Sequence, residues 1–582
     1  MSGLDGAYEL DGLRPGRYEI RASKDGYPSA AAGPVLVAAA GKTGFDPAVP
    51  SDTPQASVTA SGTAAPPSFA DAREVEALKR RVEELEAALK AVTDREQGSV
   101  DKQASAQPGA PVEVAKAAPV EPPAQEAAPA APAAPPAVDN VTPFAFGDFT
   151  WLNGNPRNKD TVWDSKFFTP EVRFDTYFAE DFNQPIDHTM GGSTEMFRNG
   201  EFQVEQISFG GDFHWQNVRG RVLTMFGMFA TTTPRNDASA GVGQWDLRDA
   251  YRYVSEAYGG YHFNVSHGLN VDAGIFVSYI GLFSYYNFDN WTYQPSYVSS
   301  NTPWFFNGLR VQWFVTNKLK IEPWIINGWQ SYAKYNGHRG LGGQILYRPY
   351  EWLSMVFNNY GNGTDDLGIP GRSRIHTDDS VEVRYYNKPE DTGISKMAFS
   401  FTGDLGCEYG GGVTCHGGKA GPKQAFLGWM VYDRTWFHKD LLALTLGGGM
   451  MNNPGRYLTL LPPINGADAV SGSPYFTMNP GDKAHMWDST INLQYMPKQY
   501  ITWWLEAGYR HSDVPYFSGR GGITPPGGNN GAPQYYACNT GATAGTADLS
   551  AATTACSGAG GVWFPDLRRG QASLSAGILV KF

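Results

Sequence analysis

The chain has 582 residues, a formal net charge of -12, 13% aromatic residues and 68 glycines. The acidic balance has no basic cluster beside it, which argues against nucleic acid as a partner. No stretch approaches about 18 consecutive apolar residues, which excludes a helical transmembrane protein. A transmembrane β-barrel fits the mean hydropathy of -0.37, because only alternate residues of its strands face lipid.

Residues 1–45 contain two short alternating segments. Within Asp5–Tyr27 apolar and polar residues alternate around a turn at Pro15–Gly16. These residues resemble the second half of a carboxypeptidase regulatory-like domain, which implies a periplasmic accessory module. The first half of such a domain is missing, and the basic and apolar regions of a signal peptide do not follow Met1. We therefore expect a partial β module and a chain that begins upstream of Met1.

A linker is expected next at 46–70, followed by a coiled coil at 71–97 and a second linker at 98–142. The second linker is dominated by Ala, Pro, Gln and Val, a composition that cannot bury a core. In 71–97 apolar residues recur in steps of three and four, which predicts a coiled coil that aids assembly of a homotrimer or dimer. These residues are Val75, Leu78, Val82, Leu85, Leu89 and Val92. A single amphipathic helix packed on another surface is the alternative.

From Phe167 onward the chain shows alternating segments of the length that crosses a bilayer at a tilt. The last of them, Gln571–Phe582, places apolar side chains on one face and ends on an aromatic residue, as a lipid-facing barrel strand does. Similar runs occupy Leu319–Ile325, Val381–Tyr385 and Ile501–Tyr509. Soluble sandwiches also contain such strands, so alternation alone does not identify a membrane protein.

The links between these segments decide the fold class, because short and long links alternate strictly. The short links lie near 217–218, 265–268, 316–318, 348–351, 387–391, 437–440 and 496–499. The long links, rich in Gly, Pro and Asn, lie near 179–200, 232–248, 285–302, 362–375, 405–422, 453–483 and 513–566. Outer-membrane barrels have short periplasmic turns and long external loops. We therefore predict an all-β fold, a transmembrane antiparallel up-and-down β-barrel, over 143–582.

Counting back from the C-terminal strand gives sixteen strands, the first near Phe167–Phe178. The extra segment Phe144–Trp151 is either a further strand with an unrecognised partner, which would make eighteen, or a piece packed in or under the pore. Sixteen is favoured because both chain ends lie on the periplasmic side, which requires an even number. Aromatic residues beside the short links are candidates for the lower aromatic girdle: Tyr350, Trp352, Trp436, Tyr495 and Tyr500.

The polar faces of the predicted strands would line a water-filled lumen, since about sixteen strands leave a barrel too wide for side chains to fill. The residues assigned to this face are Glu171, Arg173, Asp175, Gln206, Asp212, His214, Arg252, Glu256, Arg310, Gln312, Lys320, Glu322, Glu382, Arg384, Asp488, Asn492, Glu506 and Arg510.

Eight of these residues are acidic and six are Lys or Arg. The mixture predicts a general diffusion pore with a weak preference for cations rather than a selective anion site. The alternative is that many of them pair across neighbouring strands and select nothing. The aromatic link 285–302 is the one that we expect to fold inwards and narrow the pore.

The four cysteines form two local pairs in Gly-rich links, Cys407 with Cys415 and Cys538 with Cys556. Two loop disulfides are expected, which require an oxidising compartment. A metal site at Cys407, Cys415 and His416 is the rival, but no fourth ligand stands at the usual zinc spacing. We therefore expect no metal and no cofactor.

Five motifs of the barrel region resemble the OmpL-like β-barrel porin family of Gram-negative bacteria: Gly147–Gly154, Asp164–Glu171, Gly200–Gln206, Ala250–Tyr253 and Asn452–Tyr457. The resemblance covers nearly all of 144–582. It implies an outer-membrane barrel, in contact with lipid and lipopolysaccharide, that passes small hydrophilic solutes by passive diffusion. It also implies that the assembly machinery recognises the C-terminal Phe582. No site residues can be carried over from the family.

Three other functions compete with a porin. An enzyme would need a nucleophile motif, and the chain has neither a Gly-x-Ser-x-Gly elbow nor a grouping among its ten His residues, so we expect no catalytic residue. A TonB-dependent receptor would need a globular plug and about twenty-two strands. A surface adhesin or structural tether without a transport role is the alternative function, suggested by pinned loops and a long periplasmic arm.

Overall fold

The computed structural model describes most of the chain from residue 141 onward and three strands before it. These three are β1 (Gly16–Ser23), β2 (Ala30–Val37) and β3 (Ser57–Ser61), an antiparallel sheet in the order β2-β1-β3. From 141 on it describes all residues except 186–187, 192–194, 235–236, 238–244, 301, 335–337, 364–370, 453–484, 514–516 and 521–566.

Several predictions fall outside the described residues. They are the coiled coil at 71–97, nearly all of the linker 98–142, and the pair Cys538 and Cys556. The role of the N-terminal region as a periplasmic module and oligomerisation aid therefore stays a prediction.

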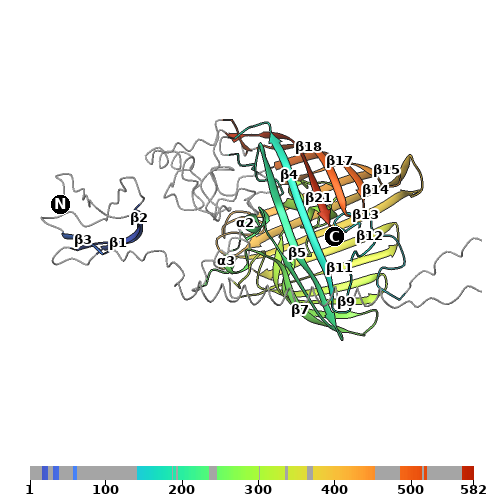
Figure 1. Ribbon diagram of the computed structural model, residues 1–582, viewed down its shortest axis with the longest axis horizontal. Coiled ribbons are helices and arrows are strands. Elements are labelled where there is room, and N and C mark those ends of the chain that lie inside the picture. Colours follow the sequence, from blue (N-terminus) through green and yellow to red (C-terminus); the bar gives the residue numbers. More distant parts are fainter. Residues whose placement is uncertain are drawn as a thin grey trace, which may run out of the picture. The chain divides into compact units, whose positions relative to one another are not determined.

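Sixteen antiparallel strands form one closed barrel. Each strand pairs with the next barrel strand, and the ring closes where β21 pairs with β4 (Figure 1). This confirms the sixteen strands expected from sequence, with the first near Phe167–Phe178, and makes the alternative of eighteen wrong. The strands are β4 (Phe168–Asp181), β5 (Glu201–Trp215), β6 (Val218–Thr224), β7 (Val254–Phe263), β8 (Leu269–Val277), β9 (Phe305–Thr316), β10 (Leu319–Ile326), β11 (Gly340–Tyr350), β12 (Leu353–Gly363), β13 (Ser373–Asn387), β14 (Ile394–Tyr409), β15 (Ala425–Phe437), β16 (Leu442–Asn452), β17 (His485–Lys498), β18 (Ile501–Ser512) and β21 (Gly570–Lys581).

Connections of two different lengths join the barrel strands. The seven predicted short links are confirmed as turns of two to six residues. Eight long connections alternate with them, one more than expected, because the sequence analysis passed over 327–339 between β10 and β11. The connection after β6 carries α2 (Phe229–Thr232) and α3 (Leu247–Tyr251), and the last one carries β19 (Phe517–Ser518) and β20 (Leu567–Arg568). None of the described helices is long and apolar enough to cross a membrane.

The two faces of the barrel wall are clearest on β17. Trp487, Ile491 and Leu493 are 40%, 55% and 45% exposed on the outer face, whereas Asp488 and Asn492 are buried on the inner face. The outer face is therefore apolar and the inner face polar, the reverse of a soluble protein. The pattern recurs around the wall, with outward side chains such as Phe357, Tyr385, Leu427, Leu446, Leu505 and Leu574. Such a band faces lipid in membrane barrels.

The predicted lower aromatic girdle is confirmed in part. The rings of Tyr350 and Trp352 stack 5.2 Å apart, both side chains are exposed, and Tyr495 is exposed as well. Trp436 was assigned wrongly, because it is 6% exposed and packs inside the barrel against Trp291. The error has a physical reason: β15 carries large side chains on both faces, so hydrophobicity does not identify its lipid side.

The C-terminal Phe582 lies beside the short turn that precedes β18. Its ring stacks on Tyr500 at 5.8 Å, and its N–H donates to the carbonyl of Val172 at 2.9 Å. The C-terminus is therefore at the short-turn end of the barrel, as expected. Its recognition by the assembly machinery stays a prediction.

One of the two expected disulfides is confirmed. Cys407 on β14 and Cys415 in the following connection are bonded, with Cα atoms 5.1 Å apart. A thiol consumed in a disulfide cannot act as a thiolate ligand, so the rival metal site with His416 is not formed.

An arginine placed on the apolar outer face should destabilise the barrel by an amount that depends on its depth in the membrane. Leu446 lies near the middle of β16 and is 50% exposed, whereas Leu441 is 36% exposed beside a short turn. Leu446→Arg should lower the free energy of unfolding in lipid vesicles by about 2–4 kcal/mol, and the control Leu441→Arg by about 0–1 kcal/mol. Denaturant titration measures both costs, and equal costs would show that the face of β16 is assigned wrongly.

Candidate functional site

The long connection between β8 and β9, residues 278–304, folds into the barrel, and we call it the inward loop. It contains η3 (Asn287–Asp289) and α4 (Tyr297–Ser300). Every residue from 286 to 299 is buried, among them the large aromatic side chains Trp291, Tyr293 and Tyr297. The expectation that 285–302 folds inwards is confirmed.

Carboxylates of the barrel wall bind the backbone of the inward loop. Glu506 on β18 accepts hydrogen bonds from the N–H groups of Tyr293 (2.7 Å) and Gln294 (2.8 Å). Asp488 on β17 accepts a hydrogen bond from the N–H of Tyr297 (3.0 Å). These two side chains thus accept hydrogen bonds from three buried backbone N–H groups and hold the middle of the loop in place.

Two further carboxylates bind side chains of the inward loop. Asp175 on β4 accepts hydrogen bonds from the Asn287 amide (2.8 Å) and the Tyr293 hydroxyl (2.9 Å). Glu256 on β7 accepts one from the Tyr286 hydroxyl (2.7 Å). All four carboxylates belong to the inward-facing set predicted from sequence. We call them the carboxylate cradle: Asp175, Glu256, Asp488 and Glu506.

Arginines of the wall bind the carbonyl groups of the same loop. Arg434 on β15 donates to the carbonyl of Trp291 at 2.8 Å, and Arg510 on β18 donates to that of Pro295 at 2.8 Å. Backbone polar groups need partners when they are taken out of water. Carboxylates of the wall thus replace water as partners of the loop N–H groups, and guanidinium groups replace it as partners of the loop carbonyls.

Residues 144–160, which we call the N-terminal plug, lie at the short-turn end of the barrel and form no strand. The Asn153 N–H donates to Glu382 on β13 at 2.8 Å, and the Trp151 indole N–H donates to the carbonyl of Glu351, in a short turn, at 3.0 Å. The extra segment Phe144–Trp151 is therefore the packed piece that sequence analysis offered as its second reading.

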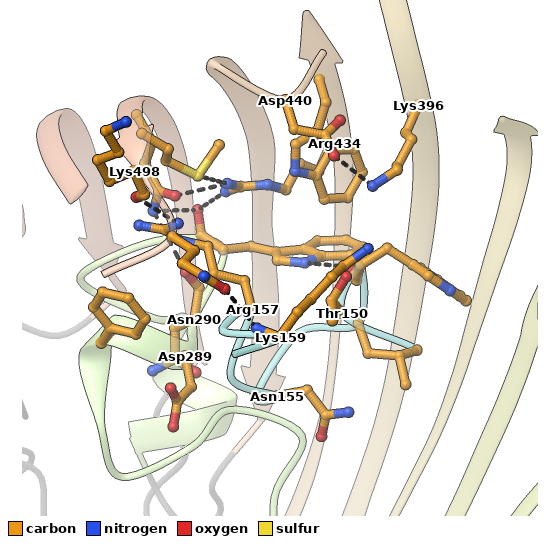
Figure 2. A pocket seen from close by; sticks show the side chains of 18 of the residues that line it. Thr150, Asn155, Arg157, Lys159, Asp289, Asn290, Lys396, Arg434, Asp440 and Lys498 are labelled. Atoms are coloured by element: carbon orange, nitrogen blue, oxygen red, sulfur yellow. Dashed lines mark hydrogen bonds and ion pairs between the residues drawn. The ribbon is translucent and has the colours of Figure 1, made fainter. Parts of the chain in front are cut away.

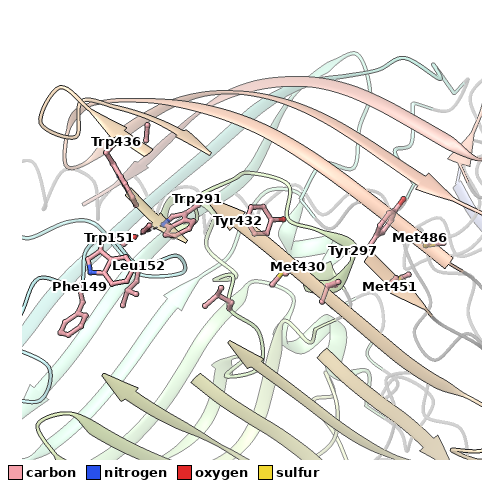
Figure 3. Close-up of a cluster of buried hydrophobic side chains, with 14 of the residues drawn as sticks. Phe149, Trp151, Leu152, Trp291, Tyr297, Met430, Tyr432, Trp436, Met451 and Met486 are labelled. Atoms are coloured by element: carbon pink, nitrogen blue, oxygen red, sulfur yellow. Dashed lines mark hydrogen bonds between the residues drawn. The ribbon is translucent and has the colours of Figure 1, made fainter. Parts of the chain in front are cut away.

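The N-terminal plug and the inward loop contact each other inside the barrel. The N–H of Trp291 donates to the Asn153 side-chain oxygen at 2.7 Å, and its indole N–H donates to the carbonyl of Trp151 at 3.0 Å. Figure 3 shows the buried side chains of this region following the inner wall from Phe149, past Trp291, towards Met486. The two segments therefore share one apolar cluster with β15, β16 and β17.

Ion pairs line the wall on the side of β4 to β7. Arg221 on β6 donates to Glu171, Asp212 and Glu256, each at 2.9 Å. Arg173 on β4 also pairs with Glu171. Charges of neighbouring strands thus neutralise one another here, as one of the two sequence-based alternatives expects.

The family model described as "Putative beta-barrel porin-2, OmpL-like" matches residues 173–535, more than half of the chain. The chain belongs to this family of porins. It is accordingly an outer-membrane β-barrel protein of Gram-negative type. No curated protein matches the chain.

Solved structures of outer-membrane proteins resemble this porin at low identity. The anion-selective porin from Comamonas acidovorans is 9% identical with a TM-score of 0.40, over 71% of this chain and 99% of that one. The outer membrane channel DcaP of Acinetobacter baumannii is 11% identical with a TM-score of 0.36, over 72% and 99%. OprD from Pseudomonas aeruginosa is 9% identical with a TM-score of 0.32, over 74% and 97%.

Most of the predicted inward-facing residues of this porin are buried on the inner face of the wall. They are Arg173, Asp175, Gln206, Glu256, Arg310, Glu322, Glu382, Arg384, Asp488, Asn492, Glu506 and Arg510. Glu171, Gln312, Lys320, Asp212 and His214 lie on strands and are partly exposed. Arg252 lies on no strand: it follows α3 in a long connection, where it pairs with Asp249 at 3.1 Å. Their part in a conducting path stays a prediction.

Sequence analysis missed many charged residues of the inner face, among them Arg221, Asp272 and Arg434. A signal for Asp272 was present, because it alternates with the outward run that begins at Leu269 on β8. Arg434 gave no such signal, since its neighbours on the same face of β15 are aromatic. Where the inner face of a strand is itself apolar, the alternation of apolar and polar residues does not reveal that a charged residue on it points inwards.

Loss of one cradle carboxylate should loosen the inward loop. Asp488→Ala removes the acceptor of the Tyr297 N–H, of the Ser296 hydroxyl and of the Gly449 N–H. A buried donor left unpaired costs about 1–3 kcal/mol, so amide hydrogen exchange at Tyr297 should speed up roughly 10- to 100-fold. Asp513→Ala is the control, because Asp513 binds His485 at the end of β17 and not the loop. Unchanged exchange at Tyr297 in Asp488→Ala would contradict the role of the cradle.

Proposed function

We propose that this porin lets small hydrophilic solutes diffuse passively through the outer membrane, and that the inward loop sets the narrowest part of the path. The observation that carries the proposal is the closed barrel of sixteen strands whose polar inner face holds a long inward connection. A barrel of this size encloses more space than its own side chains fill, so the inward loop decides how much of it a solute can use.

We also propose a weak preference for cations. Asp175, Asp488 and Glu506 of the cradle form no ion pair among the described residues and meet the loop through neutral donors. In their ionised form these carboxylates carry charges that no guanidinium or ammonium group among the described residues cancels within ion-pair distance. Uncancelled charges on a pore wall attract counter-ions of opposite sign. Membership of the family supports a channel, and the solute itself is a matter for experiment.

A structural tether is the second candidate function. It is favoured by one observation, the direct hydrogen bonds between the N-terminal plug and the inward loop, which fill part of the barrel from both ends. A filled barrel could anchor surface loops without conducting.

Conductance of the full chain in planar bilayers separates the two functions. A porin should give stable ohmic steps, and a variant with residues 285–300 replaced by a short Gly-Ser linker should give steps several-fold larger. The control shortens the connection after β14 within 416–421, where no residue is buried, and should leave the step size unchanged. If both the wild type and the 285–300 variant fold and neither conducts, the tether stands and the porin does not.

The cation preference predicts a specific change in reversal potential. Glu506→Gln keeps one acceptor oxygen for the loop and removes the charge, so it preserves the fold better than a lysine, which cannot accept the Tyr293 N–H. In a salt gradient the wild type should favour cations and Glu506→Gln should do so less. The exposed Glu390→Gln, in a short turn, serves as the charge-matched control. Identical reversal potentials in all three proteins would refute the assignment.

A further inference from the structure

A cavity of about 270 Å³ lies between the N-terminal plug, the inward loop and the wall at the short-turn end of the barrel (Figure 2). Its lining holds two acidic side chains, Asp289 and Asp440, and six basic ones: Arg157, Lys159, Lys396, Arg434, Lys439 and Lys498. This local excess of positive charge occurs in a chain whose net charge is -12. The cavity therefore has the opposite sign from the protein as a whole.

Carboxylates neutralise three of the lysines. The ion pairs are Lys396 with Asp440 at 2.5 Å, Lys439 with Glu390 at 2.9 Å, and Lys159 with Asp148 at 3.0 Å. These lysines add little to the field inside the cavity, so the two arginines matter most.

Arg434 is buried without a carboxylate. Its guanidinium donates to neutral oxygens of Trp291 (2.8 Å), Gln494 (2.6 Å) and Thr445 (3.1 Å). The side chain is 3% exposed, and it forms no ion pair in the part of the chain that the structure describes. Its positive charge is thus solvated by dipoles and by no anion of the protein.

Arg157 of the N-terminal plug is partly exposed and likewise binds neutral oxygens. It donates to the carbonyls of Lys498 (3.0 Å) and Ile501 (2.5 Å) and to the Thr502 hydroxyl (2.7 Å). Burial lowers the pKa of its guanidinium to about 10, and the more distant Asp289 opposes that shift. The group therefore stays charged at neutral pH, and it too has no ion-pair partner among the described residues.

Two positive charges facing one cavity, one of them buried, are unfavourable unless an anion compensates them. A guanidinium group matches a carboxylate in shape, since both are planar and can form two parallel hydrogen bonds. The structure thus provides charge and geometry for an anion, and the two acidic side chains of the lining, Asp289 and Asp440, pair with Arg173 and Lys396 rather than with these arginines.

Four aromatic side chains also line the cavity. Trp151, Trp291, Trp436 and Phe288 line it, and the guanidinium groups of Arg434 and Arg157 lie over the rings of Trp436 and Phe288, at 5.0 Å and 4.8 Å. A cavity of about 270 Å³ is of the size that suits a small organic molecule.

We propose that this cavity binds a small organic carboxylate with an aromatic or apolar body, held through the charges of Arg157 and Arg434. If the protein is a channel, this site indicates the class of solute that it passes, and that part of the proposal rests on the proposed function. Binding of the carboxylate does not depend on transport. It is compatible with a weak cation preference of the whole pore, because one local site can hold an anion inside a channel whose narrow part is lined by carboxylates.

Calorimetric titration of the refolded full chain in detergent tests the site, with benzoate as the probe and benzamide as its neutral analogue. Benzoate should bind saturably and benzamide should not. Arg434→Gln should weaken benzoate binding roughly 10- to 100-fold, since it removes a charge-assisted contact. Lys439→Gln is the control, because this lysine lines the same cavity but is paired with Glu390, and its effect should stay within about twofold.

Arg157→Gln is the second variant, and it decides the question if Arg434→Gln does not show the heat-modifiable mobility of a folded barrel. Arg157 lies on the plug and not on a strand, so its loss leaves the barrel ladder intact. The proposal is overturned if the folded wild type does not bind benzoate, if benzamide binds equally well, or if the folded arginine variants bind as the wild type does. Benzoate binding by a barrel that does not conduct would uphold the site and refute the porin; conductance without binding would do the reverse.

Discussion

Backbone groups that enter a barrel must find partners there, and the inner wall of this porin supplies them as charged side chains. Glu506 and Asp488 accept hydrogen bonds from N–H groups of the inward loop, and Arg434 and Arg510 donate to its carbonyls. Each unpaired backbone group inside the barrel would cost from about 1 kcal/mol to several kcal/mol of free energy. Several unpaired groups together would keep the loop out of the barrel. The position of the loop, and with it the shape of any solute path, follows from these contacts.

The charged side chains of the inner wall find partners in two different ways. On β4 to β7 they neutralise one another, as Arg221 does with Glu171, Asp212 and Glu256. Around the inward loop, Asp175, Asp488 and Glu506 bind neutral donors of the polypeptide instead. Selectivity is therefore expected from residues that hold the loop and not from residues that hold each other.

The wall could be predicted from sequence because its signals are local. Alternation within a run such as Ile501–Tyr509 and the shortness of a turn both depend on a few consecutive residues. The contents of the barrel depend on contacts between distant residues: Glu506 and Tyr293 are 213 positions apart, and no periodicity encodes their pairing. Aromatic richness indicated that 285–302 folds inwards, yet Trp436 was placed on the lipid face, since β15 is apolar on both sides. The cavity escaped prediction because Arg434 lies among those apolar residues and Arg157 precedes the first strand.

The arginine on β15 does more than its contact with the loop requires. Arg434 also donates to Gln494 and Thr445, but all three acceptors are neutral, so none of these hydrogen bonds by itself requires a charge in a buried place. A carboxylate on the wall could cancel this charge, as Asp440 cancels the charge of Lys396 in the same cavity. Among the described residues no carboxylate pairs with Arg434. Arg157 repeats the pattern from a different segment of the chain. Two uncompensated guanidinium groups that meet at one cavity from separate elements are better explained by an anion that visits the cavity than by the packing of either segment.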